Sequence, residues 1–108
     1  MLDLDAYINN STKIRLFGEE YDILEPTIGM TMEVDRIESD INTENLHEKR
    51  LETAVLFLNH NRQGKRFSQE ELKKIPFEGL SRLLAELSLF RLKADQDPNY
   101  ESQSRTEK

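Results

Sequence analysis

The side chains best suited to metal or acid–base chemistry in this sequence are two histidines. His47 and His60 stand 13 positions apart on one expected helix. At 3.6 residues per turn, this spacing places the two rings roughly 220° apart around the helix axis. They therefore cannot ligate one metal ion without a second chain, and we interpret both as solvated surface histidines.

A dense group of carboxylates is the second candidate, at Glu33, Asp35, Glu38 and Asp40. Glu33 and Asp40 lie seven residues apart and share one helix face, which allows a carboxylate pair. General acid–base catalysis further needs a pocket and a perturbed pKa. Because glutamate-rich helix surfaces are common, we interpret this group as a solvated face.

Motifs for other catalytic chemistry are absent from the sequence. It has no cysteine, so it has no disulfide framework, thiolate metal site or cysteine nucleophile. It also lacks the glycine-rich phosphate loops, the serine nucleophile motif and the HExxH zinc motif. Residues 95–99 resemble the start of a calcium loop, but Tyr100 and Thr106 stand where that loop needs glycine and glutamate. The sequence therefore predicts no enzyme activity, no cofactor and no catalytic or metal-binding residue.

The charge balance argues against nucleic acid as a partner. The chain holds 15 basic and 21 acidic residues, a net charge of -6, whereas phosphate binding requires basic surfaces. Arg62, Lys65 and Arg66 form one basic loop, which we interpret as solvated. An eight-residue loop after the helix over 44–60 is too long for a helix-turn-helix.

No membrane partner is expected either. The longest apolar run, residues 54–58, is far shorter than the roughly 20 residues that span a bilayer. Met1 is followed by neither a basic segment nor a long apolar one, so the sequence predicts a cytoplasmic protein.

The two halves of the chain differ in charge, which suits self-association. Residues 1–60 hold 5 basic and 13 acidic residues, and residues 61–108 hold 10 basic and 8 acidic ones. An acidic first half and a mildly basic second half favour head-to-tail contact between copies, or two different contact surfaces, although unequal charge on solvated faces is the simpler interpretation. The apolar fraction of 36% allows only a modest core, which a homo-oligomer or a partner surface would supplement.

The residues named above must be held by a hairpin and several helices. Residues 12–17 and 20–24 alternate in polarity, and Gly18-Glu19 between them fits a two-residue type II′ turn. Thr27 and Thr43 are expected helix caps, and Ser68 begins a capping box with Glu71. The expected helices span about 27–41, 44–60, 69–75 and 77–94.

This order predicts an α+β, mostly helical fold with a short N-terminal β-hairpin, about residues 12–24, followed by a three- to four-helix bundle. Residues 1–94 form a single small domain, because 108 residues hold one domain at most. Residues 95–108 contain one aromatic and no aliphatic residue. They are expected to form a disordered polar tail.

Three apolar residues fall outside the expected core stripes of their helices, and a fourth lies at the edge of one. Leu56 lies opposite the main apolar face of the helix over 44–60, and Leu89 and Leu92 lie off the stripe of the last helix, with Phe90 at its edge. Apolar side chains on a second face mark a candidate partner-binding surface. The alternative is a helix enclosed inside its own small core.

The order of these segments over residues 12–94 resembles the tail assembly chaperones of long-tailed bacteriophages and prophages. In that family a G-x-x-Y-x-I-x-x-P-T hairpin precedes a helical body, and an S-x-E-E-L helix start precedes a leucine-rich helix. The matching residues here are Gly18, Tyr21, Ile23, Pro26 and Thr27, then Ser68, Glu70, Glu71, Leu72 and the stretch Leu80 to Leu92.

The resemblance implies a non-enzymatic chaperone that binds the tape measure protein. Such proteins keep this long helical protein soluble while tail tube subunits polymerise around it, and they are absent from the finished virion. The chain would be the short form, and a longer frameshifted form would recruit the tail tube protein. Apolar stripes of the tape measure protein would dock on the leucine-bearing faces, with acidic residues at the rim.

Other functions remain open at this point. A small phage connector or adaptor protein would stay in the assembled particle. An acidic regulator would bind one compact partner through its helices and would not self-associate. An enzyme would need a pocket formed between chains around the carboxylates from Glu33 to Asp40 or around His47.

Overall fold

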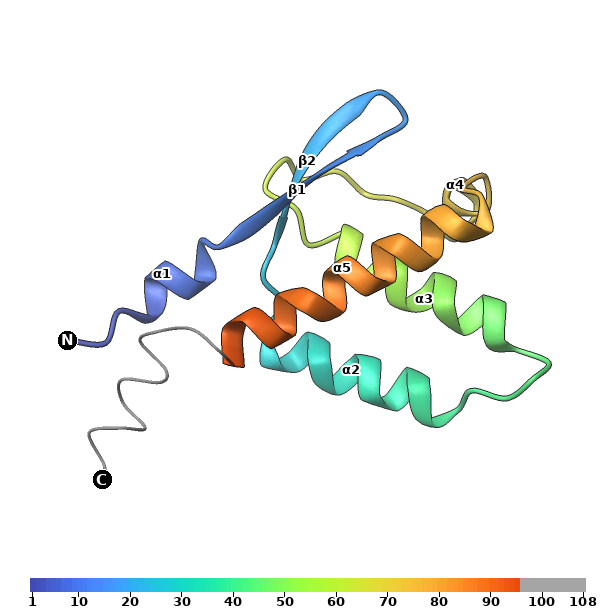
Figure 1. The fold of residues 1–108 in the computed structure, drawn as a ribbon, viewed down its shortest axis with the longest axis horizontal. Coiled ribbons are helices and arrows are strands. Elements are labelled where there is room, and N and C mark those ends of the chain that lie inside the picture. The colour runs from blue at the N-terminus through green and yellow to red at the C-terminus, as the bar shows by residue number, and fades with distance from the viewer. Residues whose placement is uncertain (96–108) are drawn as a thin grey trace.

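The computed structural model describes the backbone of residues 1–95 and the side chains of residues 1–87. Within them, a two-stranded antiparallel hairpin and five helices confirm the predicted α+β, mostly helical fold (Figure 1). The tail expected over 95–108 lies outside these residues, except for Asp95, the last residue of the final helix. The elements are α1 (Leu4–Ile8), β1 (Ser11–Leu16), β2 (Glu19–Leu24), α2 (Ile28–Ser39), α3 (Leu46–Leu58), α4 (Gln69–Leu72) and α5 (Phe77–Asp95).

The hairpin turns one residue earlier than the sequence predicts. Leu16 pairs with Glu19, so the turn residues are Phe17 and Gly18 rather than Gly18 and Glu19. Both have positive φ, 53° and 85°, which is the type I′ pattern rather than type II′. The prediction was wrong because pairing between the strands, with Ile14 and Leu16 half-buried against the core, sets the register.

Two of the predicted helix caps are present. The backbone N–H of Met30 donates to Thr27 Oγ1 at 3.1 Å, at the start of α2. Ser68 and Glu71 form a reciprocal capping box at the start of α4. Both motifs need only residues three positions apart, so local sequence is enough to predict them.

The predicted cap at Thr43 is wrong. Asn45, not Thr43, occupies the N-cap position of α3, and its side chain makes no capping hydrogen bond to the helix. Instead, Asn42 Oδ1 accepts from the N–H groups of Glu44 and Asn45 at 2.8 and 3.0 Å. Because this turn occupies residues up to 45, α3 begins two positions later than expected.

Two short segments also differ from expectation. The sequence pattern predicts no helix before the hairpin, but Asp3 caps α1 by accepting from the N–H of Asp5 at 3.1 Å. The helix expected over 69–75 ends at Leu72, and a turn closed by Ile75 N–H and Leu72 O follows.

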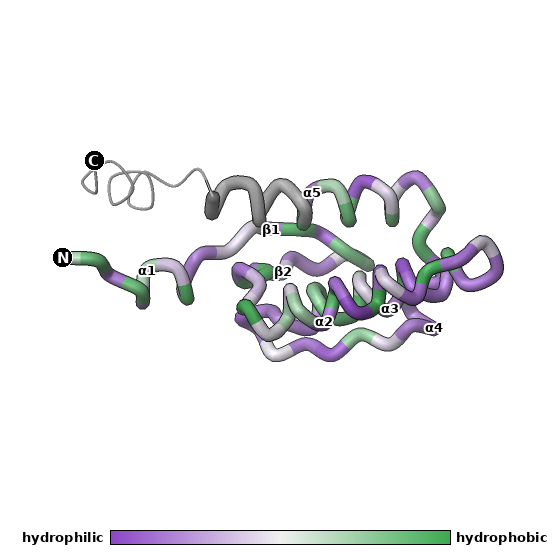
Figure 2. Tube along the Cα trace, turned by 90° about the horizontal axis from the view of Figure 1, so that it is seen from below, coloured by the Kyte–Doolittle hydropathy of each residue, from purple (hydrophilic) through white to green (hydrophobic). Residues whose placement is uncertain are grey.

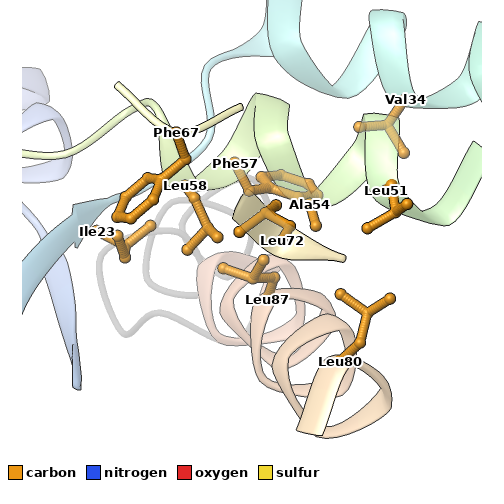
Figure 3. Close-up of a cluster of buried hydrophobic side chains, with 10 residues drawn as sticks. All are labelled: Ile23, Val34, Leu51, Ala54, Phe57, Leu58, Phe67, Leu72, Leu80 and Leu87. Atoms are coloured by element: carbon orange, nitrogen blue, oxygen red, sulfur yellow. The ribbon is translucent and has the colours of Figure 1, made fainter. Parts of the chain in front are cut away.

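Helix α3 lies at the centre of the fold and packs against α2, α4 and α5. Its apolar residues cover about half of its circumference, as a helix contacted from several directions requires. Figure 2 shows α5 in a layer on one side of α3 and α2. The core combines side chains from β2, from the helices α2 to α5 and from the loop between α3 and α4 (Figure 3). It consists of Ile23, Val34, Leu51, Ala54, Phe57, Leu58, Phe67, Leu72, Leu80 and Leu87.

The loop after α3 fastens the hairpin to the helices. The N–H of Leu24 donates to His60 O, and the N–H of Arg62 donates to Asp22 O, each at 2.9 Å. Between them, Asn61 bridges to Ile23 in the manner of a short third strand. The polar segment over 59–66 is therefore an ordered part of the fold, held by long-range backbone pairing.

Asn61 is the buried polar residue that shapes this loop. Its side-chain Nδ2 donates to Leu58 O and to Lys65 O, each at 2.7 Å, and its Oδ1 accepts from Lys65 N–H at 2.8 Å. The residue is 8% exposed, so these bonds replace the water it loses. Gly64, at φ 74°, provides the left-handed position that the tight turn needs.

Candidate functional site

A groove of about 440 Å³ runs between α2 and α3. Its apolar walls are Met30 and Ile37 from α2 and Val55 and Leu56 from α3. Met30 and Ile37 belong to the apolar stripe of α2, which the core covers only in part. We name this cleft, defined by these four residues, the α2–α3 groove.

Charged groups from three segments line the same groove. Glu33 on α2 is paired with Arg36, and Glu52 on α3 is paired with Lys49 at 3.1 Å. Both carboxylates keep a neighbouring cation, and their side chains are 40% and 35% exposed. The groove therefore presents an apolar floor with carboxylates accessible at its edge.

The loop after α3 completes the groove with His60 and Arg66. Asn59 positions this part of the loop, because its Oδ1 accepts from Phe67 N–H at 2.6 Å and its Nδ2 donates to Phe67 O at 3.2 Å. Phe67 is itself buried, and its ring lies edge-on against the ring of Tyr21, with the ring centroids 5.2 Å apart. The groove is thus preformed at this end by core packing.

The structure places Leu56, one of the four predicted partner-binding residues, in the wall of the groove. It is half-buried and packs against the core rather than projecting freely into solvent. Leu89, Phe90 and Leu92 lie on α5, but their side chains fall outside the described residues. Met30, Ile37 and Val55 were not singled out from the sequence as partner-binding residues, since each fits a core stripe.

The two histidines are not brought together. Helix α3 ends at Leu58, so His60 belongs to the following loop rather than to the helix that carries His47. His47 lies exposed against the ring of Phe77, with ring centroids 5.9 Å apart. The two histidines therefore belong to different elements of the fold.

The acidic residues do not form a shared site either. Glu33 lines the groove, whereas Asp40 is the C-terminal flanking residue of α2, and its carbonyl accepts from Asn45 Nδ2 at 2.9 Å. Among the described residues, no group of three histidine or carboxylate side chains lies close enough to hold a metal ion.

Two cations of the basic loop serve internal contacts. Arg62 donates to Asn9 O at 2.8 Å and lies 3.8 Å from Asp22. Lys65 lies 3.8 Å from Glu71 and above the ring of Phe67. These contacts tie the loop to α1, β2 and α4, which gives the basic residues a structural explanation.

A second, smaller cleft of about 260 Å³ opens between α2, α3 and α5. Val34, Phe57 and Leu84 form its apolar interior, and Glu38 and Arg50 bring opposite charges to it. We name it the Leu84 pocket. The sequence offers no signal for it, because its lining residues come from three separate helices and from Ile41 after α2.

Several large apolar side chains are exposed that the sequence pattern did not single out. Ile28 and Met32 stand one turn apart on α2, 79% and 66% exposed, and Phe77 is 61% exposed although it fits the apolar stripe of α5. Phe17 in the hairpin turn is 54% exposed. The four-residue spacing of Ile28 and Met32 is a readable signal for a second apolar face on α2.

Among the helices over residues 1–95, none is both long and apolar enough to cross a bilayer. Compared with known protein families, with curated proteins and with solved structures, the chain matches none of them.

Proposed function

We propose that this chain is a phage tail assembly chaperone, a non-enzymatic protein that binds the tape measure protein and keeps it soluble during tail tube assembly. The proposal is supported by the resemblance over residues 12–94 and by the α2–α3 groove. The groove is the observation that carries it, because a preformed apolar cleft between two helices suits the apolar stripe of a third.

The groove also suggests the chemistry of the segment it binds. Met30, Ile37, Val55 and Leu56 offer an apolar floor for side chains spaced three and four residues apart on a helix. Glu33 and Glu52 stand at the edge. They favour a segment whose apolar stripe is flanked by lysine or arginine, and they steer its approach. Repeats of such segments along one long partner would bind several copies of the chaperone.

The proposed setting is the cytoplasm of the bacterial host, before the tail is complete. The chain would be the short form, and a longer form would bring the tail tube protein to the same complex. Self-association of the short form is compatible with this role.

The test is co-expression of the chain with the tape measure protein of the same genome, followed by measurement of the soluble fraction of that protein. The wild-type chain is expected to keep it soluble. Leu56→Lys and Met30→Lys, which place a charge on opposite walls of the groove, are expected to lose this effect. Leu56→Met conserves volume and polarity and is expected to retain it.

Met32→Lys is the matched control, because Met32 lies on α2 outside the groove and is exposed. Circular dichroism of each variant shows whether the fold persists. If the tape measure protein precipitates with the wild-type chain present, the proposal fails. Incorporation into finished particles in fixed ratio would instead indicate a connector or adaptor, and tight binding to one small globular protein would indicate a regulator.

A further inference from the structure

Of the three cations in the basic loop, Arg66 differs from the other two. Arg62 and Lys65 are tied to other parts of the fold, whereas the side chain of Arg66 makes no hydrogen bond, ion pair or ring contact within the described part of the chain. Arg66 is exposed and lines the α2–α3 groove. Its guanidinium therefore keeps a positive charge and five N–H donors available to a molecule in the groove.

Two further polar side chains lie at the same end of the groove. Helices α2 and α3 run in opposite directions (Figure 1), so the start of α2, at Met30, lies beside the end of α3 and the loop that carries His60 and Arg66. Gln69, the first residue of α4, lines the groove as well. His60 and Gln69 are half-buried, and neither the ring nor the amide makes a hydrogen bond within residues 1–87. Three side chains with N–H donors and no internal partner therefore gather at one end of the groove.

The carboxylates of the groove are in a different position, because each already has a cation beside it. Glu33 is paired with Arg36 and Glu52 with Lys49, each within its own helix. Their need for a base on the occupant is therefore weaker than the need of Arg66 for an acid. An occupant that covered this end of the groove without an acid would take water from the guanidinium and return no hydrogen bond.

We propose that Arg66, with His60 and Gln69 beside it, binds the carboxylate of a glutamate or aspartate on the helix that occupies the α2–α3 groove. A carboxylate can accept two parallel N–H bonds from a guanidinium and further bonds from an amide or an imidazole N–H. This contact rests on the proposed use of the groove. It adds one requirement for the bound segment, which is an acidic residue at one end of its apolar stripe.

The contact supplies a specificity that the apolar walls lack. Met30, Ile37, Val55 and Leu56 accept any helix whose apolar stripe has the right spacing. A helix that places lysine at Arg66 brings like charges together, which weakens its binding. The groove therefore distinguishes between helices that share the same apolar residues.

The test measures the binding of three labelled synthetic peptides to the full chain by fluorescence anisotropy at low ionic strength. Each peptide has blocked ends, about 18 residues, and leucines spaced four, three and four positions apart. They differ at one residue in the last turn, which is glutamate, glutamine or lysine. Because the leucine spacing is the same from either end, a peptide can bring this residue to Arg66 in either direction. The glutamate peptide is expected to bind about fivefold tighter than the glutamine peptide, and the lysine peptide is expected to bind weakest.

Variants of the chain assign this preference to Arg66. Arg66→Gln is expected to bind the glutamate and glutamine peptides equally, and Arg66→Glu is expected to prefer the lysine peptide. Arg82→Gln is the matched control, because Arg82 is exposed on α5 and lines neither cleft, and it is expected to keep the wild-type order. Added NaCl is expected to reduce the difference between the glutamate and glutamine peptides. Circular dichroism checks that each variant is folded.

Leu56→Lys separates this contact from the groove itself, because it is expected to weaken the binding of all three peptides. Equal binding of the glutamate and glutamine peptides to the wild type overturns the role of Arg66. If Leu56→Lys still weakens both, the groove and the proposed chaperone function stand. A wild-type chain that binds none of the peptides, or an Arg66→Gln variant that keeps the full preference for glutamate, also overturns the proposal. Conversely, a tape measure protein that precipitates beside a chain with the expected glutamate preference overturns the proposed function alone.

Discussion

Asp22 on β2 and Gln63 in the loop after α3 exchange two hydrogen bonds across 41 positions of the chain. Gln63 Nε2 donates to Asp22 Oδ2, and the backbone N–H of Asp22 donates to Gln63 Oε1, each at 2.9 Å. The side chain of Asp22 is only 15% exposed. The Gln63 hydrogen bond, with smaller contributions from Lys13 and Arg62, holds the pKa of Asp22 below its ordinary value of 3.8 against the opposing effect of burial.

This relationship predicts how acid weakens the fold. An aspartate whose pKa is lower in the folded chain stabilises the fold at pH values above the ordinary pKa. That contribution is lost as the pH falls below 3.8 and through the lowered value of Asp22. Urea unfolding of the wild type from about pH 5 to about pH 2 measures the loss.

Gln63→Ala is the comparison for this prediction. Without the amide, the pKa of Asp22 rises toward its ordinary value, so the stability gap between variant and wild type is expected to narrow as the pH falls. Gln69→Ala, in α4 and away from Asp22, is the control. Its difference in unfolding free energy from the wild type is expected to stay constant as the pH falls. A Gln63→Ala gap that stays constant across the whole pH range contradicts the prediction.

Asn61→Ala is expected to destabilise the fold by about 2–3 kcal/mol, because the buried carbonyl of Leu58 and the half-buried backbone of Lys65 lose their partners. Urea unfolding at neutral pH measures the change in free energy. Asn10→Ala, at an exposed position before β1, is the control and is expected to stay within about 0.5 kcal/mol of the wild type. An equal loss of unfolding free energy in both variants would show that the hydrogen bonds of Asn61 do not stabilise the fold.

Phe17→Asn is expected to raise the free energy of unfolding by about 1 kcal/mol, because asparagine tolerates the left-handed conformation that phenylalanine resists. The expected rise in Tm is about 4–8 °C. Phe17→Ala is informative beside it, since it removes the ring without relieving the backbone strain and should not raise Tm by this amount.

Ser68→Ala is expected to lower the free energy of unfolding by about 1 kcal/mol, because the N–H of Glu71 loses the hydroxyl that caps α4. Leu72 at the end of this short helix is 1% exposed, so loss of the cap also loosens a helix that holds a core residue. Thermal unfolding measures the cost, and Ser81→Ala at an exposed position within α5 is the control. Equal Tm values for Ser68→Ala and the wild type would contradict the role of the capping box.

Local patterns in the sequence predicted the hairpin, the helices α2 to α5 and some of their boundaries, but not α1. The cap at Thr27 and the capping box of Ser68 with Glu71 depend on atoms three residues apart, which the chain brings together whenever a helix begins. The alternation of polar and apolar residues likewise predicted two strands. These features follow from periods of two and 3.6 residues.

Only the tertiary structure decided three features: the position of the hairpin turn, the fixed conformation of the loop after α3, and the two clefts. The turn at Phe17 and Gly18 follows from the register of β1 against β2, and the loop follows from bonds between Asp22 and Gln63 and around Asn61. Helical periodicity placed Leu56 away from the main face of α3 but could not show that Met30 and Ile37 stand opposite it. A groove needs two helices at a given distance and angle, and that geometry comes from packing between residues far apart in the chain, which no local period contains.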